Sequence, residues 1–314
     1  MWSFLLLLAT AFPLSAQTKD FPRDTAYNLR TAYLNIHKDY PTVTPIRPKL
    51  PKHVRFQNNV VYARVGEREL HLDIFYPARQ RKHGRPGVLM VFGGGWRSGS
   101  KEMEIPMAQQ LAGKGYVAMT VEYRLSPEAQ YPAAVYDLKA AVRWMRAHAA
   151  DYGLDTTQIA AYGCSAGAEL ASFLGTTNGM AKFEGTEGHP AHSSSVQAVL
   201  NIDGIVSFIH PEASAEGTMA GEWLGGSRVT AAENWQEASP LEHAGAHTPP
   251  FLFVNCSIPR FHAGRDDLFK ILDAAGTYHE THTIPNSTHS FWTVHPWFEE
   301  TLGYGLGFLG RVFK

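Results

Sequence analysis

The sequence is poor in cysteine, and its charges nearly cancel. Only two cysteines, Cys164 and Cys256, occur among 314 residues. They are predicted to lie at the ends of strands that are not neighbours, too far apart for a disulfide, so the core rather than cross-links must stabilise the chain. The net charge of −1 comes from 28 basic and 29 acidic residues and gives no indication of nucleic acid as a partner.

Long hydrophobic runs are also missing beyond the N-terminus. The later sequence has no run of the roughly 18 apolar residues that indicate a membrane span. Residues 2–12 are apolar, and the small residues Ser15 and Ala16 follow them, as before a signal-peptidase site. Residues 1–16 are therefore predicted to be a signal peptide, and the protein is expected to be secreted or periplasmic.

Hydrophobic residues make up 44% of the chain, which is ample for a large core. Residues 17–57 contain several prolines and are predicted to be an extended N-terminal arm. From residue 58 to residue 314, short apolar runs alternate with helical patterns. This alternation predicts an α/β domain with a mainly parallel sheet and helices on both faces. The expected strands are 59–65, 69–76, 87–92, 116–123, 158–163, 196–202, 250–256 and 278–284, and the expected helices are 102–113, 132–150, 167–175, 262–275 and 296–313.

Two segments depart from this alternation. Residues 60–76 are predicted to form an antiparallel hairpin that turns at Gly66 and Glu67. Residues 204–248 form a long stretch between two strands, rich in Gly, Ala, Glu and Trp. Since long connections in compact domains are usually functional or carry helices of their own, we expect a helical insertion over the functional site.

A sharp turn with a serine at its apex is predicted at Gly163-Cys164-Ser165-Ala166-Gly167. The pentapeptide joins an apolar strand to a helical pattern, and the glycines relieve crowding on either side of the serine. Upstream, the apolar strand 87–91 runs into Phe92-Gly93-Gly94-Gly95-Trp96. Backbone N–H groups without neighbouring side chains are the donors that a developing oxyanion needs.

With these motifs the chain resembles the α/β-hydrolases, in particular the hormone-sensitive-lipase-like esterases and the secreted carbohydrate esterases. The resemblance rests on the two glycine motifs and on three further segments, Glu122-Tyr123-Arg124-Leu125, Tyr131-Pro132-Ala133-Ala134 and Thr288-His289-Ser290-Phe291. It implies an eight-stranded α/β-hydrolase sheet, Ser165 as nucleophile, and an oxyanion hole from the amides of Gly94, Gly95 and Ala166. The chain departs from the family at Phe92, where histidine is usual, but this change leaves the amide donors untouched.

A serine nucleophile needs a base and a group that orients the base. His289 follows the last predicted strand and is the favoured base, with His295 in reserve. The acid is less clear, because no carboxylate lies near Ser257, where the family usually has one. Asp203 at the end of the sixth strand is favoured. Asp266 or Asp267 is the alternative, and a Ser–His dyad without an acid stays open.

No metal or other cofactor is expected. His279 and His282 are three residues apart on a strand and point to opposite faces, and no HExxH motif occurs. Asp137 and Arg124 also match the family pattern and are expected to be structural.

For substrate binding we expect Trp96, Arg260 and Trp292, since aromatic faces can stack on sugar rings. The expected substrate is a carbohydrate ester, namely an acetyl ester of xylan or pectin. The alternatives are a pectin methylesterase, a general short-chain carboxylesterase and, in a different class, a catalytically dead binding protein. The sequence leaves the oligomeric state open.

Overall fold

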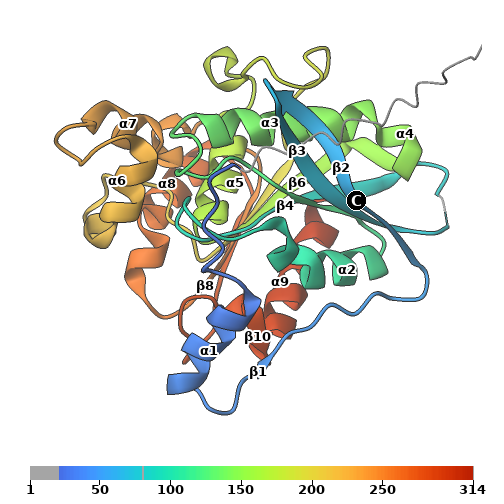
Figure 1. Cartoon of the computed structure of the whole chain (residues 1–314), viewed down its shortest axis with the longest axis horizontal. Helices are drawn as coiled ribbons and strands as arrows, with labels where there is room; N and C mark the ends of the chain where they lie inside the picture. Colours follow the sequence, from blue (N-terminus) through green and yellow to red (C-terminus); the bar gives the residue numbers. More distant parts are fainter. Residues whose placement is uncertain (1–20, 80, 314) are drawn as a thin grey trace, which may run out of the picture.

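The computed structural model describes residues 21–79 and 81–313, so the predicted signal peptide lies outside the described residues. A single eight-stranded sheet forms the centre of the molecule (Figure 1). In spatial order its strands are β2 (Val54–Val65), β3 (Arg68–Pro77), β5 (Val117–Val121), β4 (Arg85–Val91), β6 (Leu154–Cys164), β7 (Ala198–Ile202), β8 (Phe251–Asn255) and β9 (His279–Thr283).

Strand direction divides this sheet into two parts. Strands β2 and β3 form the predicted hairpin, closed where Val65 pairs with Arg68, and β3 runs antiparallel to β5. Every later pair, from β5–β4 to β8–β9, is parallel. The predicted α/β-hydrolase fold is confirmed. The parallel strands end at one edge of the sheet, where side chains from different strands can meet.

Helices cover both faces of the sheet (Figure 1). Within β4, Leu89 and Val91 belong to one apolar cluster, and Val88 and Met90 belong to the other. This alternation follows from the two-residue period of a strand. The first cluster includes residues of α3 (Ala133–Ala147) and α5 (Ala166–Thr176), and the second includes residues of α2 (Ile105–Gly113) and α9 (Trp297–Val312). The short α4 (Ala149–Tyr152) follows α3, and α8 (Arg265–Ala275) joins β8 to β9.

The N-terminal arm is not extended throughout, and that prediction is wrong for α1 (Leu29–Asp39). The Asn28 side chain caps this helix by accepting hydrogen bonds from the backbone N–H groups of Arg30 and Thr31. Ala32 and Ile36 lie four residues apart on the helix and are buried. After α1, the short strand β1 (Thr44–Pro45) pairs with β10 (Val294–His295) close to the other end of the chain.

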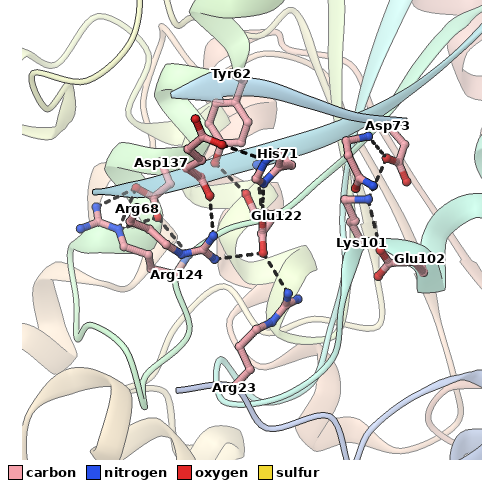
Figure 2. A network of polar contacts seen from close by, with 12 residues as sticks. Arg23, Tyr62, Arg68, His71, Asp73, Lys101, Glu102, Glu122, Arg124 and Asp137 are labelled. Atoms are coloured by element: carbon pink, nitrogen blue, oxygen red, sulfur yellow. Dashed lines mark hydrogen bonds and ion pairs between the residues drawn. The ribbon is translucent and has the colours of Figure 1, made fainter. Parts of the chain in front are cut away.

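The ion pair between Arg23 and the buried Glu122 joins the N-terminal segment to the antiparallel part of the sheet (Figure 2). The Glu122 carboxylate lies 2.9 Å from the Arg68 guanidinium and 3.1 Å from that of Arg23. Nearby, fully buried Asp137 accepts hydrogen bonds from the side chain and backbone N–H of Arg124. This pairing fits the structural role expected for Asp137 and Arg124.

The segment between β7 and β8 contains two helices, α6 (Thr218–Leu224) and α7 (Ala232–Glu237), together with short 3-10 turns. Trp223 and Trp235 from these helices are buried in the same apolar cluster as α3 and α5. Across residues 21–79 and 81–313, we find no helix with the length and apolar character that crossing a membrane requires.

Candidate active site

Ser165 stands between the end of β6 and the start of α5, with φ 53° and ψ −122°. This conformation is unusual for a residue with a side chain, and it turns the chain sharply at the sheet edge. The flanking glycines are required by close packing. A Cβ on Gly163 would lie 2.0 Å from the Gly167 carbonyl oxygen, and a Cβ on Gly167 would lie 2.2 Å from that of Val91.

His289 bridges the serine and an aspartate. Its Nε2 lies 2.8 Å from Ser165 Oγ, and its Nδ1 lies 2.7 Å from Asp203 Oδ2. The histidine comes from the loop between β9 and α9, and Asp203 directly follows β7. Three residues far apart in the sequence therefore form one hydrogen-bonded series at the carboxyl edge of the sheet.

Asp203 is fully buried and uses both carboxylate oxygens. Its Oδ1 accepts a 2.8 Å hydrogen bond from the backbone N–H of Cys256, just beyond β8. Since neighbouring β7 and β8 end together, this amide holds the carboxylate in place toward His289. The two cysteines, Cys164 and Cys256, are buried free thiols, as predicted.

The alternative residues lie elsewhere. Asp266 and Asp267, on the first turn of α8, pair with Arg265 and Lys270. A hydrogen bond from Arg265 lowers the pKa of Asp266, as expected of a solvated ion pair. His295 pairs with Glu299 on α9. The structure does not bring these three predicted alternatives to Ser165.

Two aromatic rings enclose the His289 imidazole. The Phe261 ring is stacked on it, with centroids 3.6 Å apart and planes inclined by 6°. The Trp292 ring meets it edge-on, with centroids 5.2 Å apart. These contacts restrain the plane of the imidazole, so that both of its nitrogens stay aligned with their partners.

A cavity of about 250 Å³ opens in front of Ser165 and His289. Gly94, Gly95 and Ala166 line it, as expected of the predicted oxyanion residues. Gly94 and Gly95 have φ of 129° and 60°, which favour glycine, and among the described residues their N–H groups have no hydrogen-bond acceptor. Free N–H groups beside a serine hydroxyl suit an anionic oxygen on an attacked carbonyl.

Of the predicted substrate-binding residues, only Arg260 has a substantially exposed side chain at the cavity. Trp96 lines the cavity but is only 4% exposed, because its ring stacks on Trp223 and its Nε1 donates to Glu169. Trp292 is equally buried and packs on His289 instead of lining the cavity. Their burial does not favour sugar stacking by these two tryptophans, which stays a prediction.

Among the residues lining the cavity that sequence reasoning missed are Tyr27, Glu216, Met219 and Phe261. They come from the N-terminal segment, from the insertion and from the loop after β8. The Tyr27 hydroxyl makes a 2.8 Å hydrogen bond with Ser290 Oγ, beside His289. No local pattern marks such residues, because long-range folding alone brings their segments to the sheet edge.

Two buried glutamates lie behind the cavity. Burial raises the pKa of the Glu169 carboxyl, which accepts a hydrogen bond from the Trp96 N–H, well above its usual range. Burial also raises the pKa of Glu104 to about 8. The Glu104 carboxyl accepts a weak 3.9 Å hydrogen bond from the Cys164 thiol, next to Ser165.

In the part of the chain that the structure describes, no cluster of three or more His, Cys, Asp or Glu side chains has the arrangement of a metal site. The groups at the cavity are instead a hydroxyl, an imidazole, a carboxylate and free amides. This set of groups can activate a serine and stabilise an oxyanion without a further ligand.

The chain is similar to several proteins named as esterases. LipM of Mycobacterium tuberculosis, named as a carboxylic ester hydrolase, is 28% identical over 69% of this chain and 50% of its own length. Esterase LipC of the same organism is 30% identical over 55% of this chain and 45% of its own length. The chain thus spans about half the length of the curated relatives it matches.

The similarity to solved structures covers most of this chain. A bifunctional GH43-CE protein of Bacteroides eggerthii superposes with a TM-score of 0.71 at 27% identity, over 82% of this chain and 38% of that one. Esterase Est2 of Thermogutta terrifontis gives a TM-score of 0.68 at 26% identity, over 84% of this chain and 95% of that one. The BD-FAE family model matches residues 72–259, which include Ser165 and Asp203. This chain belongs to the BD-FAE family of α/β-hydrolase-like proteins.

Proposed function

We propose that the protein is a serine carboxylesterase that hydrolyses acetyl esters on plant polysaccharide such as xylan or pectin. The observation that carries the proposal is the hydrogen-bonded series from Asp203 through His289 to Ser165, facing a cavity lined by Gly94 and Gly95. Relatives named as esterases support the reaction class.

In the proposed mechanism, Ser165 Oγ attacks the ester carbonyl while His289 Nε2 takes the hydroxyl proton. The amides of Gly94, Gly95 and Ala166 stabilise the tetrahedral oxyanion. The alcohol leaves with the proton from His289, and an acyl-enzyme remains on Ser165. A water then gives a proton to His289 and attacks the acyl carbonyl. The acid is released as the bond to Ser165 Oγ breaks and His289 returns its proton to that oxygen. Asp203 keeps the imidazole oriented and stabilises its protonated form.

The size and rim of the cavity support an acetyl ester of a sugar. A volume of about 250 Å³ suits a small acyl group. Ser98, Glu216 and Arg260 supply polar groups beside the apolar Met219, and such a rim suits a hydroxylated alcohol better than a lipid chain. The apolar segment 2–12 supports export, which would bring the enzyme to plant polysaccharide outside the cytoplasm.

Hydrolysis of p-nitrophenyl acetate by the wild type, the Ser165→Ala variant and the Ser98→Ala variant tests the reaction. Ser98 also lines the cavity and serves as the matched control. We expect Ser165→Ala to lose nearly all activity and Ser98→Ala to keep most of it. More than a few per cent of activity in Ser165→Ala would contradict the nucleophile, and an inactive wild type would indicate a binding protein.

The substrate is tested by mass spectrometry of the products from acetylated xylan and from acetylated, methylated pectin. Acetate release is expected. Methanol release from pectin would favour a pectin methylesterase, and turnover of p-nitrophenyl acetate alone would favour a general short-chain carboxylesterase.

A further inference from the structure

A second cavity lies at the end of the sheet opposite Ser165. Strand β4 starts at Arg85, in the wall of this cavity, and leads after Val91 to the glycines beside Ser165. At about 3.3 Å per residue, Arg85 is roughly 25 Å from Gly93. The cavity measures about 660 Å³ and is lined by residues within 77–79 and 81–85, by the end of α2 and by the residues that precede β5.

Positive charge dominates its lining. Five cationic side chains line the cavity and His53 joins them, whereas its lining residues include no aspartate or glutamate. None of the five forms an ion pair with any residue in 21–79 or 81–313. The five cations are Arg79, Arg81, Lys82, Arg85 and Lys114.

Arg85 distinguishes this cavity from an ordinary solvated basic surface. The residue is 8% exposed, and its guanidinium donates to the carbonyl oxygens of Gly115 and Arg79, at 3.2 and 2.6 Å. Burial lowers the pKa of Arg85, and the nearby charges of Arg81 and Arg79 lower it further. Neutral carbonyls satisfy N–H groups but leave the charge uncompensated, and a buried cation without an anion is costly.

We propose that this cavity binds a carboxylate-bearing oligosaccharide, a short chain of uronate units. The need for an anion follows from the cavity itself, whereas the choice of a uronate chain rests on the proposed function. The volume lies in the range of sites for ligands of several rings. A single inorganic oxyanion would fill only a small part of a cavity of this volume.

The proposal predicts that trigalacturonate binds to the full chain, whereas neutral xylotriose does not. The test variant is Arg81→Gln/Lys114→Gln, in which two exposed cations of the cavity are replaced. The control, Arg30→Gln/Lys38→Gln, removes the same charge from exposed positions on α1. By calorimetry at low salt we expect at least tenfold weaker binding in the test variant and wild-type binding in the control. Added salt should weaken the wild-type interaction.

Three results would overturn the proposal. Equal loss in both variants would indicate binding to net charge alone. Undiminished binding in the cavity variant would place the oligomer elsewhere, for example at the Ser165 cavity. Displacement of trigalacturonate by an equal concentration of inorganic phosphate would mean that the site holds a single oxyanion. Turnover of p-nitrophenyl acetate by the cavity variant is expected to stay at the wild-type level. A wild type that is inactive but still binds trigalacturonate would refute the proposed esterase activity and not the proposed binding site.

Discussion

At Asp203 the backbone has a φ of 56°, in the left-handed region that residues with side chains seldom adopt. Hydrogen bonds hold both oxygens of the side chain, because one accepts from the Cys256 N–H and the other pairs with His289 Nδ1. A strained backbone and two fixed contacts place the carboxylate in a single position. This arrangement supports Asp203, directly after β7, as the proposed acid in place of one on the loop after β8.

The Asp203→Asn substitution should lower kcat/KM for p-nitrophenyl acetate by about 10³–10⁴-fold, because an amide orients the imidazole poorly and cannot stabilise its cation. Asp266→Asn and Asp267→Asn are matched controls that should stay near wild type, since both side chains are paired on α8. A large loss in either control with an active Asp203→Asn would refute the assignment.

The stacked Phe261 ring has its own expected effect. Phe261→Leu removes the flat surface against the imidazole, so His289 should sample orientations in which it does not reach Ser165. We expect kcat to fall about tenfold while KM changes little, which corresponds to about 1.4 kcal/mol of transition-state stabilisation. Phe261→Tyr keeps the ring and should restore kcat. A change in KM alone would instead assign Phe261 to substrate binding.

Among the elements, α1 shows why part of the fold escaped prediction. The prolines at 41, 45, 48 and 51 all follow the helix, and they made the whole of 17–57 look extended. Residues 29–39 contain no proline, and their apolar positions include Leu29, Ala32, Tyr33 and Ile36 at helical spacing. The strands of the sheet were easier, because buried parallel strands appear as short continuous apolar runs.

The N-terminal segment before α1 brings Tyr27 into the cavity, where the Tyr27 ring approaches Gly94. Tyr27→Ala should enlarge the cavity and raise the butyrate-to-acetate ratio of kcat/KM several-fold, whereas Tyr27→Phe should leave this ratio unchanged. Tyr33→Ala, on α1 and outside the cavity lining, is the control for general loosening of the arm. The measurement is a series of p-nitrophenyl esters, and an unchanged ratio in Tyr27→Ala would show that another residue limits the acyl group.

At the scale of the whole molecule, Glu104 couples stability to pH. The pKa of Glu104 is about 8 in the folded protein, against an ordinary value of 4.5, because the carboxyl is buried beside Cys164. Burial also keeps nearby Tyr27 and Tyr162 neutral by raising the pKa of each phenol. The folded state therefore holds the Glu104 proton more tightly than the unfolded chain does. Stability should fall as pH rises from about 4.5 to about 8, and this contribution should be constant above that.

The side chain in Glu104→Gln has no proton to release, so the fall in stability between about pH 4.5 and about pH 8 should be absent in this variant. The free energy of unfolding of the variant minus that of wild type should be larger at pH 9 than at pH 5, by an amount on the order of a few kcal/mol. Urea unfolding at the two pH values measures the difference. The exposed Glu233→Gln is the control and should follow wild type. Parallel pH profiles for wild type and Glu104→Gln would contradict the inferred protonation.

Some residues of the candidate site could be predicted from the sequence and others could not, for a physical reason. Ser165 and the glycines of residues 93–95 depend on local backbone shape, which a short motif records. The contact from Asp203 to His289 spans 86 residues of sequence, and the one from Tyr27 to Ser290 spans 263. Such contacts depend on how the whole sheet is assembled, so the acid stayed open among Asp203, Asp266 and Asp267, and Tyr27 was missed.

One consequence follows from where the cavity residues originate. Ser165, Asp203 and His289 follow β6, β7 and β9, whereas the cavity residues Tyr27 and Met219 belong to the segment before α1 and to the insertion between β7 and β8. The reacting groups are thus fixed to the framework, and the walls around them belong to replaceable parts. Exchanging one such segment for that of a relative should change which esters enter the cavity, while the positions of Ser165, Asp203 and His289 stay the same. We therefore expect that the substrate selectivity of the proposed esterase can be changed without changing its reacting groups.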